Sequence, residues 1–337
     1  MPTNIKKILR FIKRLIIAFT FLSILIFIIY DIILTVQMEQ IAHSDNSSYI
    51  NPSFCEDVQI HMVDVGQGDG FVITHKDKVI VVDCGIMLHP SRMKDYLEEI
   101  GVKRVNLLIL THPHQDHFGG IAKILCNFKV DKIITTEIPS KTDMTLIERF
   151  HLYKCNYIIA KFNLINRYSK VESFKSDDGK LKSLSIGDVK FKFLGPIKEY
   201  NDINNNSLVF KMTYKNTSVL FTGDIEKEAE LDLVETYGDQ LKVDILKLSH
   251  HGSHTSSTEE FLESTNPKYA LISCEYANKL WHPHQEVASR LKEQGIILYR
   301  TDEAGNVVLT LDGNTVKSKS QECDYKSGSQ LSEISQQ

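Results

Sequence analysis

The chain has 337 residues, of which 42% are hydrophobic and 24% are charged, so it can form one large folded domain or two ordinary ones. Its formal net charge is −4, although the first fifty residues carry five basic against three acidic side chains. A general nucleic-acid-binding protein normally has a strongly basic surface, and this balance excludes one. A phosphodiester substrate would therefore have to be held by a local patch or by metal ions.

An apolar run occupies residues 15–36 and is interrupted only by Asp31. As a helix, its 22 residues would extend about 33 Å, enough to cross the hydrocarbon core of a bilayer. Five basic side chains precede the run. We therefore predict a cytoplasmic basic segment at residues 1–14, a single transmembrane signal anchor at residues 15–36, and an extracytoplasmic domain after it. Asp31 is expected near the far interface, within reach of headgroups and water.

Two alternatives to an uncleaved anchor fit the run less well. A cleaved signal peptide would have a shorter apolar region followed by a small-x-small cleavage site, and no clear site of this kind follows the run. A buried core helix fits least at this length.

The rest of the sequence is predicted to form one folded domain between two polar segments. Residues 37–56 are predicted as a short stalk, residues 57–315 as the domain and residues 316–337 as a polar tail. Strands are predicted near residues 58–64, 70–75, 78–83, 105–110, 131–135, 189–194, 207–213, 217–222, 242–248, 268–274, 296–300 and 306–311. Helices are predicted near residues 91–100, 119–127, 225–237, 258–265 and 285–294. This order favours an α/β fold of two packed sheets with helices on the outer faces.

The densest cluster of chemistry-bearing residues is His-Pro-His-Gln-Asp-His at residues 112–117, directly after an apolar strand. In an extended segment, His112 and His114 point the same way, whereas Asp116 and His117 follow the turn and can face a second ion. Imidazole and carboxylate together suit zinc and its first-row neighbours. Four ligand-type side chains in six residues disfavour a polar loop with chance histidines.

Two further strands end in a carboxylate. Asp83 ends the buried strand Val-Ile-Val-Val-Asp and is placed to hold a ligating imidazole, or else to cap a turn. Asp224 follows Leu-Phe-Thr-Gly and precedes a helix, so it is either an N-cap or a carboxylate that bridges two metals.

Two more histidine clusters follow, at His250, His251 and His254 and at His282 and His284. Together with residues 112–117 they contain eight of the 13 histidines, all at predicted strand ends or helix starts. Random scatter would not place them so. The lysine before the second cluster, Lys247, is predicted as a strand residue with a solvated head.

The order of DVGQGD, VVDCG, THPHQDHFGG, FTGD, LKLSHHGS and HPH resembles the metallo-β-lactamase fold. More narrowly, it resembles the ComEC-like hydrolase domain of competence DNA-uptake proteins, over roughly residues 58 to 311. The resemblance implies a four-layer αββα fold behind a single N-terminal transmembrane helix. Because only one membrane span is found, we expect the hydrolase domain on a single anchor and not a DNA channel.

The resemblance also implies roles for the motif residues. It places His112 and His114 on a first divalent ion, Asp116 and His117 on a second, Asp224 between them, and either His250 or His251 on the second. The ions would be Zn²⁺ or Mn²⁺. Asp116 or Asp224 would orient a metal-activated water, and His282 or His284 would contact the substrate phosphate or protonate the leaving oxygen, with Lys247 and Ser253 as weaker candidates.

One ligand expected by the resemblance has no clean counterpart. The superfamily's additional histidine before the bridging aspartate could only be His151, whose setting looks helical. The segment at residues 204–207 (Asn-Asn-Asn-Ser) fits the subgroup's pattern better, which leaves the first ion short of a nitrogen ligand.

Three functions are compatible with these residues. The motif set favours a membrane-anchored, extracytoplasmic, metal-dependent phosphodiesterase or nuclease acting on DNA or another phosphodiester. The acidic balance favours a metallohydrolase acting on a lactam, thioester or other phosphoester, since DNA affinity depends on cationic side chains. A non-catalytic binding domain would require a lost metal site, and the retained HPHQDH and Asp224 argue against it.

Overall fold

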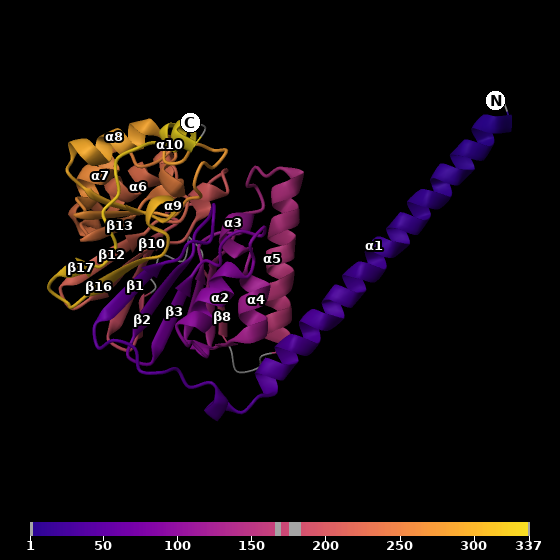
Figure 1. Ribbon diagram of the computed structural model, residues 1–337, viewed down its shortest axis with the longest axis horizontal. Helices are drawn as coiled ribbons and strands as arrows, with labels where there is room; N and C mark the ends of the chain where they lie inside the picture. The colour runs from indigo at the N-terminus through magenta and orange to yellow at the C-terminus, as the bar shows by residue number, and fades with distance from the viewer. Residues whose placement is uncertain (1–2, 166–169, 175–182, 336–337) are drawn as a thin grey trace.

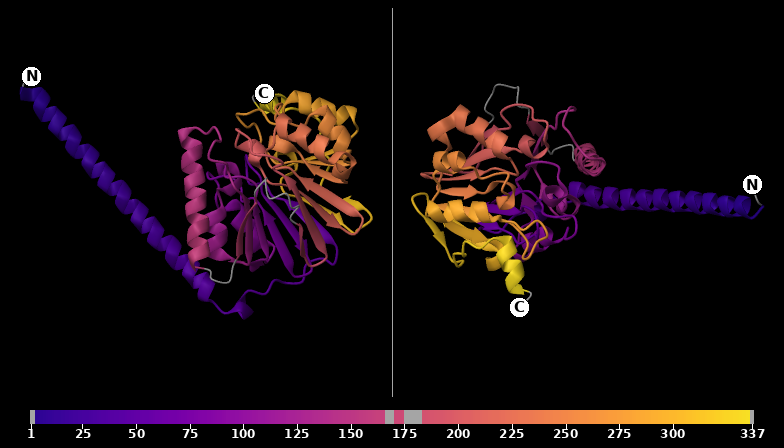
Figure 2. Two further views of the ribbon diagram at one scale, coloured as in Figure 1. Left: turned by 180° about the vertical axis from the view of Figure 1, so that it is seen from behind. Right: turned by 90° about the horizontal axis from the view of Figure 1, so that it is seen from above.

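Two mixed β-sheets pack face to face in the computed structural model, and helices cover both outer faces (Figures 1 and 2). The structure describes residues 3–165, 170–174 and 183–335. This arrangement confirms the predicted four-layer αββα fold. A long helix, α1 (Thr3–His43), projects from the domain. Its segment Phe11–His43 is long and apolar enough to cross a membrane, and an 18-residue window within it has a mean hydropathy of 2.6.

The first sheet has the order β17 (Val316–Ser318), β16 (Val307–Leu311), β1 (Val58–Met62), β2 (Phe71–His75), β3 (Lys78–Val82), β5 (Leu107–Leu110), β7 (Lys132–Thr136) and β8 (Lys170–Phe174). The second has the order β15 (Ile297–Arg300), β14 (Tyr269–Ile272), β13 (Ile245–Lys247), β12 (Thr217–Phe221), β11 (Val209–Tyr214), β10 (Val189–Gly195) and β9 (Ser183–Ile186). A small ribbon pairs β4 (Arg104–Val105) with β6 (Lys129–Val130).

The helices divide between the two outer faces. They are α1 (Thr3–His43), α2 (Arg92–Glu99), α3 (Gln115–Phe118), α4 (Ile121–Asn127), α5 (Leu146–Ile165), α6 (Lys227–Tyr237), α7 (Glu259–Thr265), α8 (Gln285–Glu293), α9 (Thr301–Ala304) and α10 (Gly328–Ser335). Side chains of α2, α4 and α5 form one core with the first sheet, and those of α6, α7 and α8 form another with the second.

The third core lies between the sheets and follows from the period-2 alternation of apolar residues. In β12, Val219 and Phe221 point into this central core, whereas Leu220 points outward to the helices. Phe221 stacks on Phe210 of β11, with ring centroids 4.9 Å apart. Both sheets are therefore buried on two faces, as strands covered by helices require.

The carboxyl ends of four parallel strands determine where polar residues gather. β3 pairs in parallel with β5, and β12 with β13. The residues just beyond these strands are those at 83, 111–117, 222–224 and 249–251. Because parallel strands end at a common edge, the sheets deliver these segments to one place.

The N-terminal helix departs from the expected anchor and stalk. α1 continues to His43, and Leu34 and Met38 are buried in the core formed by α2, α4 and the first sheet. Asp31, which was expected to reach headgroups and water, instead pairs with Lys161 and accepts a hydrogen bond from Tyr157, both on α5. The last part of α1 thus packs on the domain.

The C-terminal segment also differs from a polar tail. β17 pairs with β16, and α10 follows, with Ser327 and Leu331 buried. The predicted strands and helices all have counterparts, but α3, α5, α9, α10, β8, β9, β17 and the short ribbon of β4 and β6 were not predicted as separate elements. The sequence of α5 does not show the period of an amphipathic helix, because large apolar residues lie on its exposed as well as its buried face.

A buried histidine makes stability depend on pH. His61 of β1 lies 2.7 Å from the Tyr96 hydroxyl and 3.2 Å from Thr74 Oγ1, and burial lowers its pKa to about 4. In the unfolded chain, the imidazole of His61 becomes protonated near pH 6.5, whereas in the folded protein it stays neutral down to about pH 4. The free energy of unfolding should therefore fall by on the order of 3 kcal/mol as pH drops from about 6.5 to about 4. In His61→Gln, this part of the pH dependence of the free energy of unfolding should disappear. Urea unfolding of the full chain in detergent with chelator, at pH 7 and pH 4.5, measures it, and equal pH slopes for both proteins would contradict it.

Candidate metal centre

The HPHQDH segment turns sharply after β5, which brings its second half back toward the sheet edge. His114 is extended, with φ −75° and ψ 149°, and its carbonyl accepts from the backbone amides of His117 and Phe118 at 3.0 and 3.1 Å. The β1–β2 loop passes close by, where the Asp69 amide donates to the Asp116 carbonyl at 3.1 Å. A side chain at Gly68, whose φ is +144°, would collide with that carbonyl, which explains this glycine of DVGQGD.

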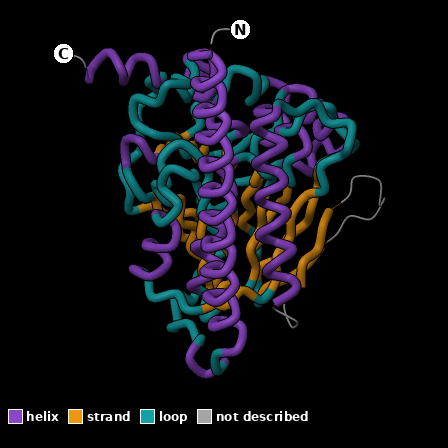
Figure 3. The backbone as a smooth tube through the Cα atoms, turned by 90° about the vertical axis from the view of Figure 1, so that its right-hand side faces the viewer, coloured by secondary structure: helices purple, strands orange, loops and turns teal. Residues whose placement is uncertain are grey.

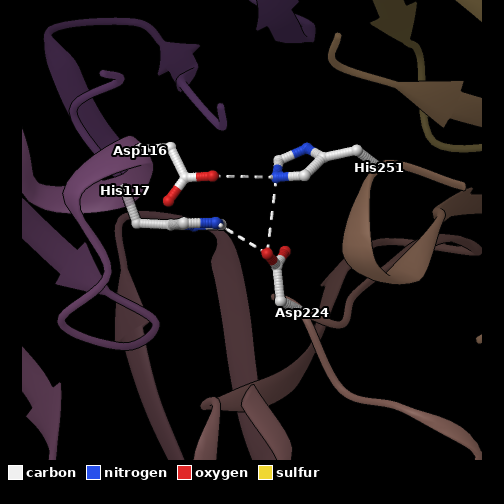
Figure 4. A group of neighbouring side chains, drawn as sticks. All are labelled: Asp116, His117, Asp224 and His251. Carbon is white, nitrogen blue, oxygen red and sulfur yellow. Dashed lines mark ion pairs between the residues drawn. The ribbon is translucent and has the colours of Figure 1, made fainter. Parts of the chain in front are cut away.

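Four side chains converge at the edge where the two sheets meet: Asp116, His117, Asp224 and His251 (Figure 4). One ligand-type atom from each lies within 4.8 Å of all the others. His117 Nε2 is 3.1 Å from Asp224 Oδ2, and His251 Nε2 is 3.4 Å from the same oxygen and 3.6 Å from Asp116 Oδ2. Each sheet thus contributes one imidazole and one carboxylate.

Hydrogen bonds made by Nδ1 orient the imidazoles of His117 and His251. His117 Nδ1 lies 2.8 Å from Asp83 Oδ2, and Asp83 also accepts from the amide and hydroxyl of Thr111 at 2.8 and 2.7 Å. His251 Nδ1 lies 2.8 Å from the Ser273 carbonyl, to which it donates. With Nδ1 engaged on each ring, Nε2 faces the cluster. Asp83 therefore lies directly behind the His117 imidazole, and its role in supporting a metal ligand stays a prediction.

Adjacent histidines at 250 and 251 point in different directions. Both have positive φ, at 49° and 54°, and this backbone turn sends His251 into the cluster. His250 Nδ1 instead lies 3.2 Å from Glu226 Oε1, toward the start of α6.

His112 and His114 border the four-residue cluster without joining it. The His112 ring is 4.2 Å from that of His117 and 4.7 Å from that of His114, measured between centroids. His114 Nε2 faces Glu148 of α5, whose Oε1 is 3.6 Å away. His151, the candidate for a further ligand, is on α5 with its ring 6.3 Å from Phe118.

The Asn-Asn-Asn-Ser segment supports the loop that carries Asp224. Asn205 Oδ1 accepts from the Glu226 amide at 2.7 Å, and Ser207 Oγ accepts from the Asp224 amide at 3.1 Å. These contacts give the segment a structural role beside the cluster.

The family of the chain follows from comparison with known proteins. Residues 63–275, more than half of the chain, match the metallo-beta-lactamase superfamily. The chain belongs to this superfamily.

Relatives of the metallo-β-lactamase domain carry competence names. The chain is 29% identical over 280 residues to ComE operon protein 3 of Bacillus subtilis (strain 168), and the aligned region covers 77% of this chain and 34% of that protein. It is 30% identical over 258 residues to competence protein ComA of Neisseria gonorrhoeae, and the aligned region covers 76% of this chain and 33% of that protein. The chain spans about a third of the length of these two relatives. The ComEC-like resemblance expected from the motifs is confirmed.

Solved structures agree on the fold. A CmlA beta-hydroxylase variant matches with a TM-score of 0.51 and 14% identity, covering 77% of this chain and 54% of that one. At this identity the likeness supports the metallo-β-lactamase fold and nothing further.

A buried ion pair behind the cluster was not predicted. Lys247 is only 1% exposed, so the solvated head expected for it is wrong. Its ammonium pairs with Asp69, lies 3.4 Å from Asp224 Oδ1 and donates to the Gly223 carbonyl at 2.8 Å. A lysine between the apolar residues Leu246 and Leu248, directly before a histidine pair, is the sequence signal that marks it.

Opposing charges set the protonation of the cluster. Burial would raise the pKa of the Asp224 carboxyl, but His117, His251 and Lys247 hold it well below its usual value. Burial likewise opposes protonation of His117, but Asp224 and Asp83 outweigh it and raise the pKa of that imidazole well above the ordinary range. In the metal-free protein, these carboxylates therefore favour the charged form of the His117 imidazole.

These residues fit a divalent cation. The Nε2 atoms of His112, His114, His117 and His251 are buried and, among the described residues, make no hydrogen bond of good geometry, although the last three lie 3.1–3.6 Å from a carboxylate oxygen. Buried polar atoms normally have a partner, so their convergence beside two carboxylates calls for one. Imidazole nitrogen with carboxylate oxygen is a donor set for Zn²⁺, Mn²⁺ or Fe²⁺. The metallo-β-lactamase fold itself binds divalent metals.

The third histidine cluster lies at the rim. The His282 ring is 6.1 Å from that of His251, and burial, followed by His251 and His250, lowers the pKa of His282 to about 3. A neutral imidazole at pH 7 can donate a hydrogen bond to substrate but has no proton to give, which argues against His282 as the acid. His284 Nδ1 accepts from the His254 amide at 3.1 Å and is half-exposed, so it lies further out.

Removing the buried ammonium should be costly. Lys247→Met leaves Asp69 and Asp224 without their buried cation, and we expect the free energy of unfolding to fall by about 3–5 kcal/mol. Adding Asp69→Asn should restore a substantial part of it, because one uncompensated carboxylate is then removed. Chemical unfolding of the metal-free full chain in detergent measures both, with the exposed Lys190→Met as a control. A Lys247→Met cost below about 1 kcal/mol, as expected for an exposed ion pair, would contradict the role given to the buried ammonium.

Proposed function

We propose that this chain is a membrane-anchored, metal-dependent phosphodiesterase or nuclease. The observation that carries the proposal is the cluster of Asp116, His117, Asp224 and His251, whose inward-facing imidazole nitrogens are buried beside carboxylates without forming hydrogen bonds of good geometry. Membership of a superfamily of hydrolases supports hydrolysis as the reaction, and the competence relatives support a phosphodiester substrate.

The metal ligands in this proposal come from both sheets. His117, Asp116, Asp224 and His251 would hold one ion, and His112 and His114, with Asp224 between the two, would hold the other. Divalent ions bound there would make water nucleophilic near neutral pH and offset charge that develops on a phosphoryl oxygen.

Protein groups supply positioning. Asp83 and the Ser273 carbonyl keep the Nε2 atoms of His117 and His251 pointed inward. Asp116 is the most accessible member of the cluster, with a side chain 23% exposed, so its carboxylate can accept a hydrogen bond from the attacking water. His282, neutral at pH 7, can donate a hydrogen bond to a substrate oxygen.

The location proposed for the domain follows from the N-terminal segment. Basic residues precede the apolar helix, which favours an extracytoplasmic domain held by residues 15–36. Protease added to intact cells should then digest the domain, and protection from the protease would reverse this orientation.

The neighbouring histidines give a matched test of the site. We expect His251→Ala to lower turnover by at least about 100-fold, because it removes an inward-facing ligand. His250→Ala should cause a much smaller loss, because its imidazole faces Glu226. Hydrolysis of a chromogenic bis-phosphodiester with Mn²⁺ or Zn²⁺, with circular dichroism to confirm folding, measures the difference. Equal losses in the two variants would contradict the assignment.

A substrate panel separates the proposed function from its alternative. Cleavage of single- or double-stranded DNA, besides the small diester, would support a nuclease. The net charge of −4 favours the second candidate, a metallohydrolase for a lactam, thioester or small phosphoester. Hydrolysis of one of these without any DNA cleavage would establish it instead.

A further inference from the structure

One helix of the domain exposes an unusual amount of apolar surface. On α5, five large hydrophobic side chains are 60–84% exposed: Leu146, Ile147, Phe150, Tyr153 and Leu164. Among the described residues outside α1, ten large hydrophobic side chains are exposed, and these five are half of them. Concentration on a single helix marks an interaction surface, whereas scattered exposed residues would not.

The fold does not need this face of α5. The opposite face already packs on the domain, where Cys155, Ile158 and Phe162 are buried in the core with α4 and the first sheet. A helix packed on one side normally presents polar residues to water on the other. An apolar outer face therefore implies that something other than water covers it.

The exposed face of α5 is continuous with α1. The ring of Phe27 on α1 lies 6.0 Å from that of Tyr157, which in turn stacks on Tyr153 with centroids 6.4 Å apart. One turn further along α5, Lys161 pairs with Asp31 of α1. From this contact, α1 and the N-terminal half of α5 extend toward the same end of the molecule (Figures 1 and 3).

The position of this contact along α1 identifies the occupant. A helix needs about 20 residues to cross a hydrocarbon core of about 30 Å, so a span that starts at Leu15, just after Lys13 and Arg14, reaches about as far as Leu34. Phe27 is twelve residues after Leu15, about 18 Å along the axis, and so lies inside this span. A bilayer around α1 must therefore also meet α5.

The charges on α5 suit a lipid surface. Its charged residues are Glu148, Arg149, Lys154 and Lys161, of which only one is acidic. Glu148 is turned inward, because it bonds to the Thr145 amide at 2.6 Å and faces His114. The exposed Arg149 lies beside the exposed Tyr153 and exposed aliphatic residues, a combination typical of helices that lie at a membrane interface.

We propose that the exposed face of α5 docks on the bilayer that α1 crosses, with α1 tilted so that α5 lies in the interface and the rest of the domain outside. The inference rests on the proposed anchor. Its consequence concerns the metal centre: Glu148 in the first turn of α5 is 3.6 Å from His114, so docking holds the centre at the membrane surface. A substrate would then be cleaved close to the bilayer.

Fluorescence depth measurements test this on the full chain in vesicles of phosphatidylglycerol and phosphatidylethanolamine. The only tryptophan, Trp281, is replaced by phenylalanine, and Phe150→Trp or Tyr153→Trp is introduced. Lipids brominated on their acyl chains should quench both reporters and shift their emission to the blue, while aqueous acrylamide should quench them little. Asn314→Trp, on the exposed β16–β17 turn away from α5, is the matched control and should show the reverse.

A reporter in the anchor separates the two hypotheses. Phe19→Trp on α1 should be quenched by brominated lipid if the anchor is correct. A different result would be that brominated lipid quenches Phe19→Trp while the reporters on α5 respond like Asn314→Trp. This result would overturn the docking of α5 and leave the anchor intact. Reporters on α5 that neither quencher reaches would show that α1 or a second copy covers this face, which also overturns it.

Discussion

Buried negative charge at the junction of the two sheets is the constraint on which the rest of the structure depends. Asp69, Asp83 and Asp224 are each no more than 2% exposed, and Asp116 lies beside them. Lys247 is the one permanent cation buried in their midst among the described residues. Burying unpaired carboxylates is very unfavourable, so further positive charge is required. Protonated imidazoles supply it in the protein alone, and divalent ions would supply it better because they also satisfy the inward-facing Nε2 atoms.

The fold can be understood as a frame for this charge. Two sheets buried on both faces provide the apolar core, and the ends of their parallel strands supply the edge at which so many polar groups can gather. Supporting contacts then fix each group: Asp83 holds His117, the Ser273 carbonyl holds His251, and Ser207 holds the backbone at Asp224. Helix α1 joins the same frame, because its Leu34 and Met38 complete the outer core and α5 links α1 to His114.

Much of this frame can be predicted from the sequence, because strand period and strand-end residues are local signals. The ligand-type residues at 112–117, 224 and 250–251 are recognisable in that way, as is the strand-end carboxylate of Asp83. The choice between His250 and His251 cannot be made, since it depends on a backbone turn with positive φ at both residues. The apolar neighbours Leu246 and Leu248 signal that Lys247 is buried. Its partner Asp69 cannot be predicted, because it is far away in sequence. α5 was missed because large apolar residues lie on its outer face as well, between polar ones, and these exposed apolar residues carry the proposed membrane contact.

Metal binding by the purified full chain tests the central claim most directly. The protein in detergent is stripped with chelator and dialysed against Zn²⁺ or Mn²⁺, and the bound metal is counted by mass spectrometry. We predict about two ions per wild-type chain, and loss of both in Asp224→Ala, since Asp224 contacts imidazoles of the cluster and, in the proposed function, would bind both ions. A wild-type chain that retains no metal, or an Asp224→Ala variant that retains as much as the wild type, would contradict a two-metal centre built on Asp224.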